Sequence, residues 1–497
     1  MHGCLHRTLR ILAGFLVLAA AAASARAADV TKANNTDDLN LASSWVGGSA
    51  PGSGDTIVWD STVTAANIVL LGADLDVQGV RIANPGGNVT INAGNTLTLG
   101  SAGIDMSAST RNLTIKSGLA LSQNQEWTIN ANRTTSFEGG VLSGNSLLTK
   151  SGEGTLGLFN LSDDYTGFTG GIKLIAGVLR AWGNRNTVLG VGNAGLELAG
   201  GELRLESNFN QNYARNTTVS GSATIYNNST NNGGAMSYTL GTLSIGANTL
   251  TVNRNAKGAT TGNITFGATT LTGNSTFNVG DHGTDPAALN QLRLGAVGES
   301  GGSRDLLKSG GGTLILSGAS SYTGTTTISD GILALAAGGS LDGSSAITVA
   351  SDAVFDISAI NSGLTIATDQ LLAGAGSILG SLSFGSDSKL AFSSSLTIDS
   401  GTVNFDGFGI DDITGLDGTV VSEGSYSLLG GDASFDLTGA ANVGAANAAD
   451  IGGGRLAYFD GAGLQVIVVP EPTGLLLLGG GGICGGLALL GRRLRTS

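Results

Sequence analysis

The chain contains two stretches of nearly the same sequence, Lys150-Ser151-Gly152-Glu153-Gly154-Thr155-Leu156-Gly157-Leu158 and Lys308-Ser309-Gly310-Gly311-Gly312-Thr313-Leu314-Ile315-Leu316. In the first copy, Tyr165-Thr166-Gly167 and then Ala176-Gly177-Val178-Leu179 follow; in the second, Tyr322-Thr323-Gly324 and then Asp330-Gly331-Ile332-Leu333 follow. Each copy predicts a strand, a glycine turn, a corner with a tyrosine and a second strand. Such a unit cannot bury its own apolar face, so it must stack on neighbouring units.

Short alternating runs fill the rest of the body, for example Val89-Thr90-Ile91, Leu113-Thr114-Ile115, Ile347-Thr348-Val349 and Leu396-Thr397-Ile398. Apolar residues two positions apart place one side of each strand in a core, while Thr faces water. No stretch of the body shows sustained helical periodicity. Short strands at regular spacing allow a sandwich or a solenoid, and the internal repeats favour the solenoid.

The composition excludes several classes of protein. The 497 residues include 82 Gly, 41% hydrophobic residues and 12% charged residues, with a net charge of −13. A glycine-rich chain without a Gly-X-Y period is not collagen, and this hydrophobic content is too high for a disordered chain. An acidic surface repels nucleic acid, so we expect no nucleic-acid partner.

The two repeats resemble the autotransporter-associated β-strand repeat of bacterial passenger domains, with Leu307 to Leu335 as the closer copy. The resemblance implies an all-β fold, a right-handed parallel β-helix. We therefore predict a β-helix over residues 28–351, with repeat regions at about 119–182 and 291–341. Residues 352–469 are predicted to continue the solenoid or to form a small separate β-domain.

The start of this body holds two of the four Trp residues of the chain, within the segment from Ser44 to Trp59. Because the open end of a β-helix exposes strand edges, a cap is needed there. The segment is predicted to be that cap or, alternatively, an ordinary first coil with surface Trp residues.

Residues 1–27 have the pattern of a secretory signal peptide and predict an N-terminal signal helix. Arg7 and Arg10 precede an apolar run, and Ala25 and Ala27 flank Arg26 in a small-x-small cleavage site. The expected partners are the Sec translocon and signal peptidase. The alternative is a short N-terminal membrane helix, for which the apolar run is too short to span a bilayer.

Residues 470–497 have three parts: Pro470-Glu471-Pro472, an uncharged segment 473–491, and Arg492-Arg493-Leu494-Arg495. The segment 473–491 predicts a transmembrane helix, and Arg492, Arg493 and Arg495 predict a cytoplasmic stop-transfer cluster. This order resembles a PEP-CTERM sorting signal. The resemblance implies that an exosortase-type membrane protease recognises Pro470, Glu471 and Pro472. The protein would then be anchored transiently before it reaches the cell surface or extracellular matrix. The alternative is a permanent membrane anchor.

Candidate chemical sites are sparse in this sequence. Gly298-Glu299-Ser300-Gly301-Gly302 matches a nucleophile elbow, but no His follows Ser300, so a loop is expected. His282 with Asp281 and Asp285 forms a weak metal-site pattern, and a surface loop is expected there too. The acidic pairs are expected to be turn or solvated residues: Asp37-Asp38, Asp163-Asp164 and Asp411-Asp412.

Cysteine provides no site in the body, because Cys4 and Cys484 lie in the predicted signal and membrane segments. The sequence therefore predicts no catalytic residue, no metal site and no cofactor. We expect a secreted, surface-directed structural or adhesive β-helix protein that associates with extracellular polysaccharide or matrix. Two alternatives stay open: a polysaccharide lyase or hydrolase on the same fold, and an adhesin with a specific ligand, which would show an exposed aromatic patch or long excursion loops.

Overall fold

The computed structural model describes residues 28–160, 165–192, 194–228, 236–254, 262–280, 290–460 and 464–471. The described chain divides into two compact units. The first unit extends to Thr323 and includes Asp330–Ala334, and the second comprises Gly324–Ser329 and the chain from Leu335 onward. The regular secondary structure of the described residues consists of β-strands joined by turns, and of four short 3-10 helices: η1 (Ala42–Ser44), η2 (Tyr165–Gly167), η3 (Ile410–Asp412) and η4 (Ala445–Asn447).

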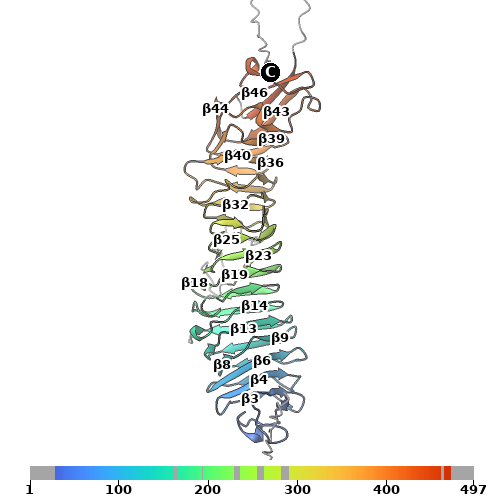
Figure 1. The fold of residues 1–497 in the computed structure, drawn as a ribbon, viewed down its shortest axis with the longest axis vertical. Helices are drawn as coiled ribbons and strands as arrows, with labels where there is room; N and C mark the ends of the chain where they lie inside the picture. The colour runs from blue at the N-terminus through green and yellow to red at the C-terminus, as the bar shows by residue number, and fades with distance from the viewer. Residues whose placement is uncertain are drawn as a thin grey trace, which may run out of the picture. The chain divides into compact units, whose positions relative to one another are not determined.

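In the first unit, strands from successive turns of the chain pair in parallel, which is the arrangement of a β-solenoid (Figure 1). The first sheet contains, in order of pairing, β1 (Asp29–Thr31), β2 (Thr56–Trp59), β4 (Leu75–Ile82), β6 (Thr96–Met106), β9 (Gln125–Ile129), β12 (Leu148–Ser151), β14 (Ile172–Leu174), β16 (Leu196–Leu198), β19 (Thr217–Val219), β22 (Leu243–Ile245), β25 (Thr269–Leu271) and β28 (Val297–Glu299). Beside this order, β8 (Gly118–Leu121) pairs with β6 and with β11 (Leu142–Ser143).

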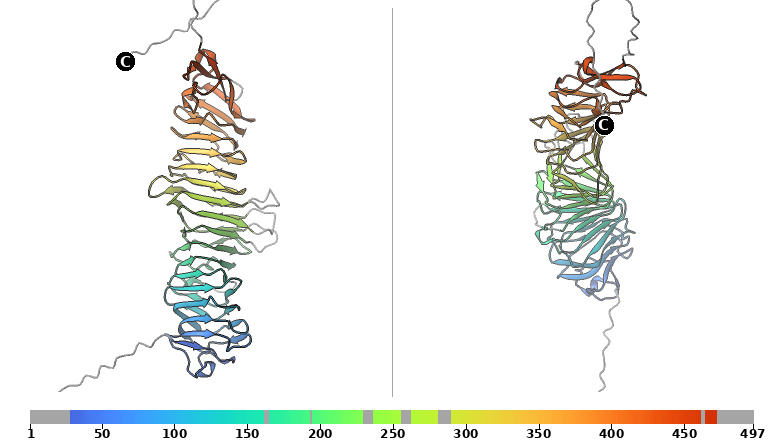
Figure 2. Two further views of the ribbon diagram at one scale, coloured as in Figure 1. Left: turned by 90° about the vertical axis from the view of Figure 1, so that its right-hand side faces the viewer. Right: turned by 45° about the horizontal axis from the view of Figure 1, so that its top comes forward.

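Two further parallel sheets complete the coils of the first unit, and Figure 2 shows their strands from two other directions. The second sheet contains β3 (Asn67–Val69), β5 (Val89–Ile91), β7 (Leu113–Ile115), β10 (Thr134–Glu138), β13 (Thr155–Asn160), β15 (Val178–Gly183), β17 (Glu202–Glu206), β20 (Ala223–Asn227), β23 (Thr249–Arg254), β26 (Ser275–Val279) and β29 (Leu306–Ser309). The third sheet contains β18 (Gln211–Asn212), β21 (Ser237–Thr239), β24 (Asn263–Thr265), β27 (Gln291–Leu294), β30 (Thr313–Leu316) and β32 (Gly331–Leu335).

The core forms because apolar residues alternate with polar ones along each strand. In β7, Leu113 and Ile115 are fully buried while Thr114 is half-buried. Leu113 pairs with Val89 in the coil before and with Thr135 in the coil after, so one coil's buried residues rest on those of the next. The predicted all-β parallel solenoid is therefore confirmed, and its right-handedness stays a prediction.

Glycines occupy corresponding corners of successive coils in the repeat region. Gly152, Gly177 and Gly201 all have positive φ, between +66° and +70°. A Cβ atom on Gly177 would lie 2.4 Å from the carbonyl oxygens of both Gly152 and Gly154. Only glycine combines this backbone conformation with so close an approach.

The first Lys of each repeat copy binds two successive coils together. Lys150 is fully buried, and its Nζ donates to the carbonyl oxygens of Ser151 (2.7 Å), Gly152 (2.6 Å) and, one coil further on, Ala176 (3.0 Å). The Nζ of Lys308 donates in the same way to the carbonyl oxygens of residues 309, 310 and 330. Burial lowers the pKa of each ammonium to about 8, although a nearby carboxylate acts in the opposite direction.

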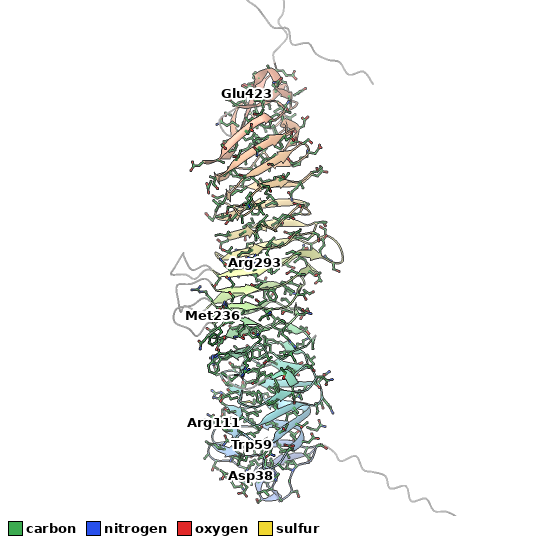
Figure 3. All side chains as sticks on the ribbon, turned by 90° about the vertical axis from the view of Figure 1, so that its left-hand side faces the viewer. Asp38, Trp59, Arg111, Met236, Arg293 and Glu423 are labelled. Carbon is green, nitrogen blue, oxygen red and sulfur yellow. The ribbon has the colours of Figure 1, made fainter. Side chains whose placement is uncertain are left out.

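The segment between β1 and β2 closes the start of the first unit. Trp45 and Trp59 are buried, 2% and 0% exposed, and their rings meet edge to face with centroids 6.3 Å apart. Figure 3 labels Trp59 together with Asp38 at this end of the first unit. The backbone N–H groups of Leu39 and Asn40 donate to the carbonyl oxygens of residues 70 and 71, just beyond β3. The expected cap fits this arrangement, and the alternative of surface Trp residues is wrong because both indole rings pack into the core.

The second unit also contains parallel ladders, followed by an antiparallel end. One ladder contains β31 (Thr325–Ile328), β33 (Ala346–Val349), β36 (Leu371–Gly374), β39 (Lys389–Ala391) and β42 (Ile413–Thr414); another contains β35 (Leu364–Ile366), β38 (Leu382–Gly385), β41 (Thr402–Asp406) and β44 (Ser434–Gly439). The last sheet starts with parallel pairs and becomes antiparallel at β47: β34 (Ala353–Asp356), β37 (Ser377–Leu379), β40 (Leu396–Ser400), β43 (Gly424–Gly430), β47 (Leu464–Pro470), β46 (Arg455–Asp460) and β45 (Ala449–Asp450). The predicted domain boundary at residue 352 stays a prediction.

The predicted signal helix over residues 1–27 and membrane helix over 473–491 lie outside the described residues. Within the residues that the structure does describe, no helix has the length and apolar character needed to cross a membrane.

Candidate functional site

Aromatic and arginine side chains gather on the outer side of the second sheet in the first unit. We call this set the aromatic–arginine face; it consists of Phe159 on β13, Arg180 and Trp182 on β15, Arg204 and Glu206 on β17, and Tyr226 on β20. The parallel register aligns Phe159 with Trp182 and Trp182 with Glu206, and it aligns Arg180 with Arg204 and Arg204 with Tyr226. Neighbouring strands lie about 4.8 Å apart, so these side chains form one continuous surface over four coils.

Direct contacts hold the aromatic side chains in place. The Phe159 and Trp182 rings meet edge to face with centroids 5.3 Å apart, and the Arg180 guanidinium lies 5.4 Å from the Phe159 centroid. The Arg204 guanidinium lies 5.8 Å from the Tyr226 ring. Gly157 leaves room for this packing, since a Cβ there would lie 2.2 Å from Phe159 Cε2. Such cation–π contacts preorganise a surface of half-exposed rings.

The charges of the face are compensated within it. Glu206 is only 1% exposed, and it accepts hydrogen bonds from Arg180 Nε at 2.6 Å and from Asn228 Nδ2. Arg204 pairs with Glu202 through its Nε. A buried carboxylate needs such partners because desolvation of an unpaired charge is costly.

An open pocket of about 410 Å³ borders the face, at the corner where the chain leaves β15 and β17. Its walls are residues 184–187 and 209–211, and we call it the amide pocket. Phe209 is 59% exposed, and within the described part of the chain it is the one aromatic side chain in the exposed class. Ser207, which follows Glu206, contacts two pocket residues through its hydroxyl: it donates to Asn184 Oδ1 (3.3 Å) and accepts from Gln211 Nε2 (3.1 Å).

This combination suits a ligand with both apolar faces and many hydrogen-bonding groups. Aromatic rings offer apolar surface to such a ligand, while amides and guanidinium groups orient it. The carboxylates of Glu202 and Glu206 are held in ion pairs with Arg204 and Arg180. Among the residues that the structure describes, no group of three or more His, Cys, Asp or Glu could hold a metal ion.

The sequence-predicted chemical sites are not gathered into this region. Ser300 follows β28 on an exposed turn, with no helix after it, so the strand-to-helix elbow is not formed. Asp37 accepts a hydrogen bond from the hydroxyl of Ser43 in the N-terminal segment, as a turn residue does. The other two weak candidates, His282 with Asp281 and Asp285, and Asp163-Asp164, lie outside the described residues.

One member of the pair Asp411-Asp412 is buried. Asp412 is 7% exposed rather than solvated, and its carboxylate accepts from Lys389 Nζ at 2.7 Å and from the backbone N–H of Gly409 at 2.9 Å. The hydrogen bond to Asp412 raises the pKa of Lys389. Asp412 is thus a turn residue, as predicted, but a buried one because η3 turns its side chain toward β39, while Asp411 is exposed.

The sorting-signal residues are described only in part. Pro470 ends β47, and the backbone N–H of Glu471 donates to the carbonyl oxygen of Gly454 at 2.8 Å. The remaining predicted sorting, stop-transfer and cleavage residues lie outside the described residues: Pro472, Arg492, Arg493, Arg495, Ala25 and Ala27.

The aromatic–arginine face was missed at the sequence level, although a signal for it is present. Glu202-Leu203-Arg204-Leu205-Glu206 alternates three charges with leucine in a chain with only 12% charged residues. Arg180 and Trp182 likewise alternate with the buried Ala181. Alternation predicts that these side chains face outward. Which of them become neighbours on successive coils can be known only from the pairing register of the strands.

Comparison with known proteins finds a repeat family in two segments of the chain. The passenger-associated-transport-repeat family matches residues 148–181 and 306–335, which are the two repeat copies. The chain is therefore a parallel β-solenoid that contains two segments similar to this repeat family.

A curated relative matches part of the sequence. The adhesin BmaC autotransporter of Brucella suis biovar 1 (strain 1330) is 38% identical over 107 residues. This match covers 21% of the present chain and only 3% of the relative's length. No solved structure matches significantly.

Proposed function

We propose that this protein is a surface-exposed, adhesin-like β-solenoid that binds extracellular polysaccharide at the aromatic–arginine face and amide pocket. The observation that carries the proposal is the presence of three half-exposed rings on one sheet: Phe159 and Trp182 align on the adjacent strands β13 and β15, and Tyr226 on β20 aligns with Arg204. A sugar ring has an apolar C–H face, which packs on aromatic rings, and a rim of hydroxyls, which hydrogen-bond to amides and arginines. The match to an adhesin supports the surface location.

Binding of the purified full chain to immobilised polysaccharides tests this proposal. Trp182→Ala should lower affinity about tenfold or more, since aromatic side chains are frequent hot spots of binding energy. Tyr458→Ala is the matched control: Tyr458 is a half-exposed aromatic on β46, in the other unit. Equal binding by wild type and Trp182→Ala, with unchanged thermal unfolding, would contradict the site.

The proposal is one of binding without turnover. The Arg–Glu pairs of the face fix its carboxylates in position, and we expect no release of reducing ends or unsaturated sugars from a bound polysaccharide. Saturable cleavage of any glycan that disappears in Glu206→Gln would instead assign a polysaccharide lyase or hydrolase.

We further propose export through the Sec translocon with cleavage after Ala27, followed by recognition of Pro470, Glu471 and Pro472 by an exosortase-type protease. The support is the order of the three sequence parts at the C-terminus. Mass spectrometry of the surface form should find a C-terminus upstream of Arg492. An intact Arg495-Thr496-Ser497 end on the surface form argues for a permanent anchor.

A further inference from the structure

The aromatic–arginine face has an aromatic ring at each end and two guanidinium groups between them. One register position is shared by four residues on successive coils: Gly157, Arg180, Arg204 and Tyr226. The Phe159 ring packs over Gly157, so the order across the coils is ring, guanidinium, guanidinium, ring. With strands about 4.8 Å apart, the two end rings are about 14 Å apart. A ligand that contacts both rings must therefore cross the strands.

Trp182 differs from the other three Trp residues of the chain in its indole N–H group. Each of the other three donates from Nε1 to an acceptor inside the protein, at 2.8 Å: Trp45, Trp59 and Trp127. The Nε1–H of Trp182 has no acceptor among the residues that the structure describes, and its side chain is half-exposed. A ligand that packs on this ring can therefore accept a hydrogen bond from it.

The two arginines of the face offer further donors. Each uses its Nε in an ion pair, Arg180 with Glu206 and Arg204 with Glu202. Within the described part of the chain, the terminal Nη groups of both arginines have no acceptor. The middle of the face therefore needs a ligand with hydrogen-bond acceptors.

The carboxylates of this surface determine the charge of such a ligand. Glu202 accepts from Arg204 through Oε1, and its Oε2 has no donor among the described residues. Glu138 on β10 aligns with Phe159 at one end of the face, and no ion pair of the described chain includes it. With Glu206, three carboxylates thus face two guanidinium groups, on a chain with a net charge of −13. A negatively charged ligand would be repelled here.

We propose that the aromatic–arginine face binds an uncharged polysaccharide whose chain crosses β13, β15, β17 and β20. Its hydroxyl groups accept from Trp182 Nε1 and from the arginine Nη groups, and they donate to Glu202 Oε2. Its sugar rings pack on the aromatic side chains at the two ends. This inference rests on the proposed polysaccharide binding, and it names the class of polymer and its direction on the surface.

Matched pairs of polymers test the charge of the ligand. Hydroxyethylcellulose, dextran and soluble starch are uncharged, and each has a carboxymethylated counterpart with the same backbone. The assay uses the full chain at low ionic strength, where charges are screened least. Any uncharged polymer that binds should bind about tenfold or more tightly than its counterpart. Equal or tighter binding of the carboxymethylated counterpart overturns the inference.

Glu202→Gln tests whether the face itself makes this choice. The new amide oxygen still accepts from Arg204 Nε, while one negative charge is removed. Glu197→Gln is the matched control, because Glu197 is also an outward carboxylate in an ion pair, 2.9 Å from Lys173 Nζ, but on β16 of the first sheet.

The preference for the uncharged polymer should decrease about threefold or more in Glu202→Gln and remain in Glu197→Gln. Unchanged thermal unfolding of both variants shows that the coils are preserved. An equal preference in wild type and both variants would place the discrimination outside the face and overturn the inference.

A hexasaccharide prepared from the bound polymer tests the direction of the chain, because it is long enough to reach both end rings. Trp182→Ala and Tyr226→Ala should each weaken its binding about fivefold or more, whereas Tyr458→Ala should not. A loss in only one of the first two variants would show that the ligand does not cross the coils.

The failure of this inference differs from the failure of the proposed function. A preference for carboxymethylated polymers that is still lost in Trp182→Ala overturns the uncharged ligand and leaves the proposed polysaccharide binding intact. Binding to none of a broad set of polysaccharides overturns the proposed function and the inference with it.

Discussion

At the scale of single residues, the two buried lysines show how a repeat motif stabilises its fold. Lys150 and Lys308 each supply an ammonium group to three backbone carbonyl oxygens, one of which lies in the next coil. Lys116 begins the truncated copy Lys116-Ser117-Gly118, but its side chain is half-buried and makes no such set of bonds. The same Lys-Ser-Gly sequence therefore has different structural roles at different positions of the chain.

Lys150→Met should destabilise the protein by about 1–3 kcal/mol, because it leaves three carbonyl groups unsatisfied next to the core. Lys116→Met is the control and should change the free energy of unfolding by about 0.5 kcal/mol or less. Urea denaturation of the two variants checks this. Equal midpoints for Lys150→Met and wild type would show that water satisfies the carbonyl groups.

The same lysines predict a dependence of stability on pH. Their pKa is about 8 in the folded protein, whereas the ordinary pKa of a lysine, which applies to the unfolded chain, is 10.5. Between these values the unfolded chain binds more protons than the folded one, so the free energy of unfolding should increase as the pH rises from 8 to 10.5. The double variant Lys150→Met/Lys308→Met should lose the part of this increase that the two lysines contribute, and Lys116→Met should retain it. A difference between wild type and double variant that is constant over this range contradicts the prediction.

At the scale of elements, the coil corners depend on glycines that stack from one coil to the next. Gly177 combines φ of +68° with backbone oxygens 2.4 Å from a Cβ position, whereas Gly48 has φ of +70° and no atom within 4 Å. A substitution at Gly48 therefore measures the cost of the backbone conformation alone, whereas a substitution at Gly177 adds the cost of a steric clash.

Gly48→Ala should destabilise the protein by about 1 kcal/mol, from the left-handed conformation alone. Gly177→Ala should cost about 3 kcal/mol or more, since the opposing atoms are backbone oxygens that cannot move independently. Thermal unfolding of both variants gives the comparison. Similar losses in the two variants would mean that the coils shift apart at low cost.

At the scale of the whole molecule, a solenoid transmits a disturbance mainly to adjacent coils. The second unit contains a cluster of Phe side chains in which Phe408 contacts Phe384 at 5.2 Å and Phe405 at 5.6 Å between ring centroids. The first unit has its own core of stacked aliphatic residues, so each unit offers a separate place to measure stability.

Phe408→Ala should destabilise the second unit by about 3–5 kcal/mol through the cavity that it creates. Hydrogen exchange should become faster in β41, β44 and β46, while β4 to β10 keep their protection because they share no contact with the cavity. Faster exchange throughout both units would show that the described chain unfolds as one cooperative body.

The sequence by itself favoured a solenoid, because alternation defines an inner and an outer side for each strand and the repeats define a stacking unit; the resemblance of the repeats to a known family implied that the strands are parallel. It also indicated the glycine corners and a tyrosine at each corner, and the structure shows that these tyrosines, Tyr165 and Tyr322, are buried. Only the tertiary structure decided the candidate site: Phe159, Trp182 and Glu206 meet because successive coils bring residues more than 20 positions apart into register. Coil lengths vary, with bonds between adjacent coils that join residues 23 apart at Thr128–Ser151 and 31 apart at Asn274–Asp305. Spacing along the chain therefore cannot show which outward side chains become neighbours.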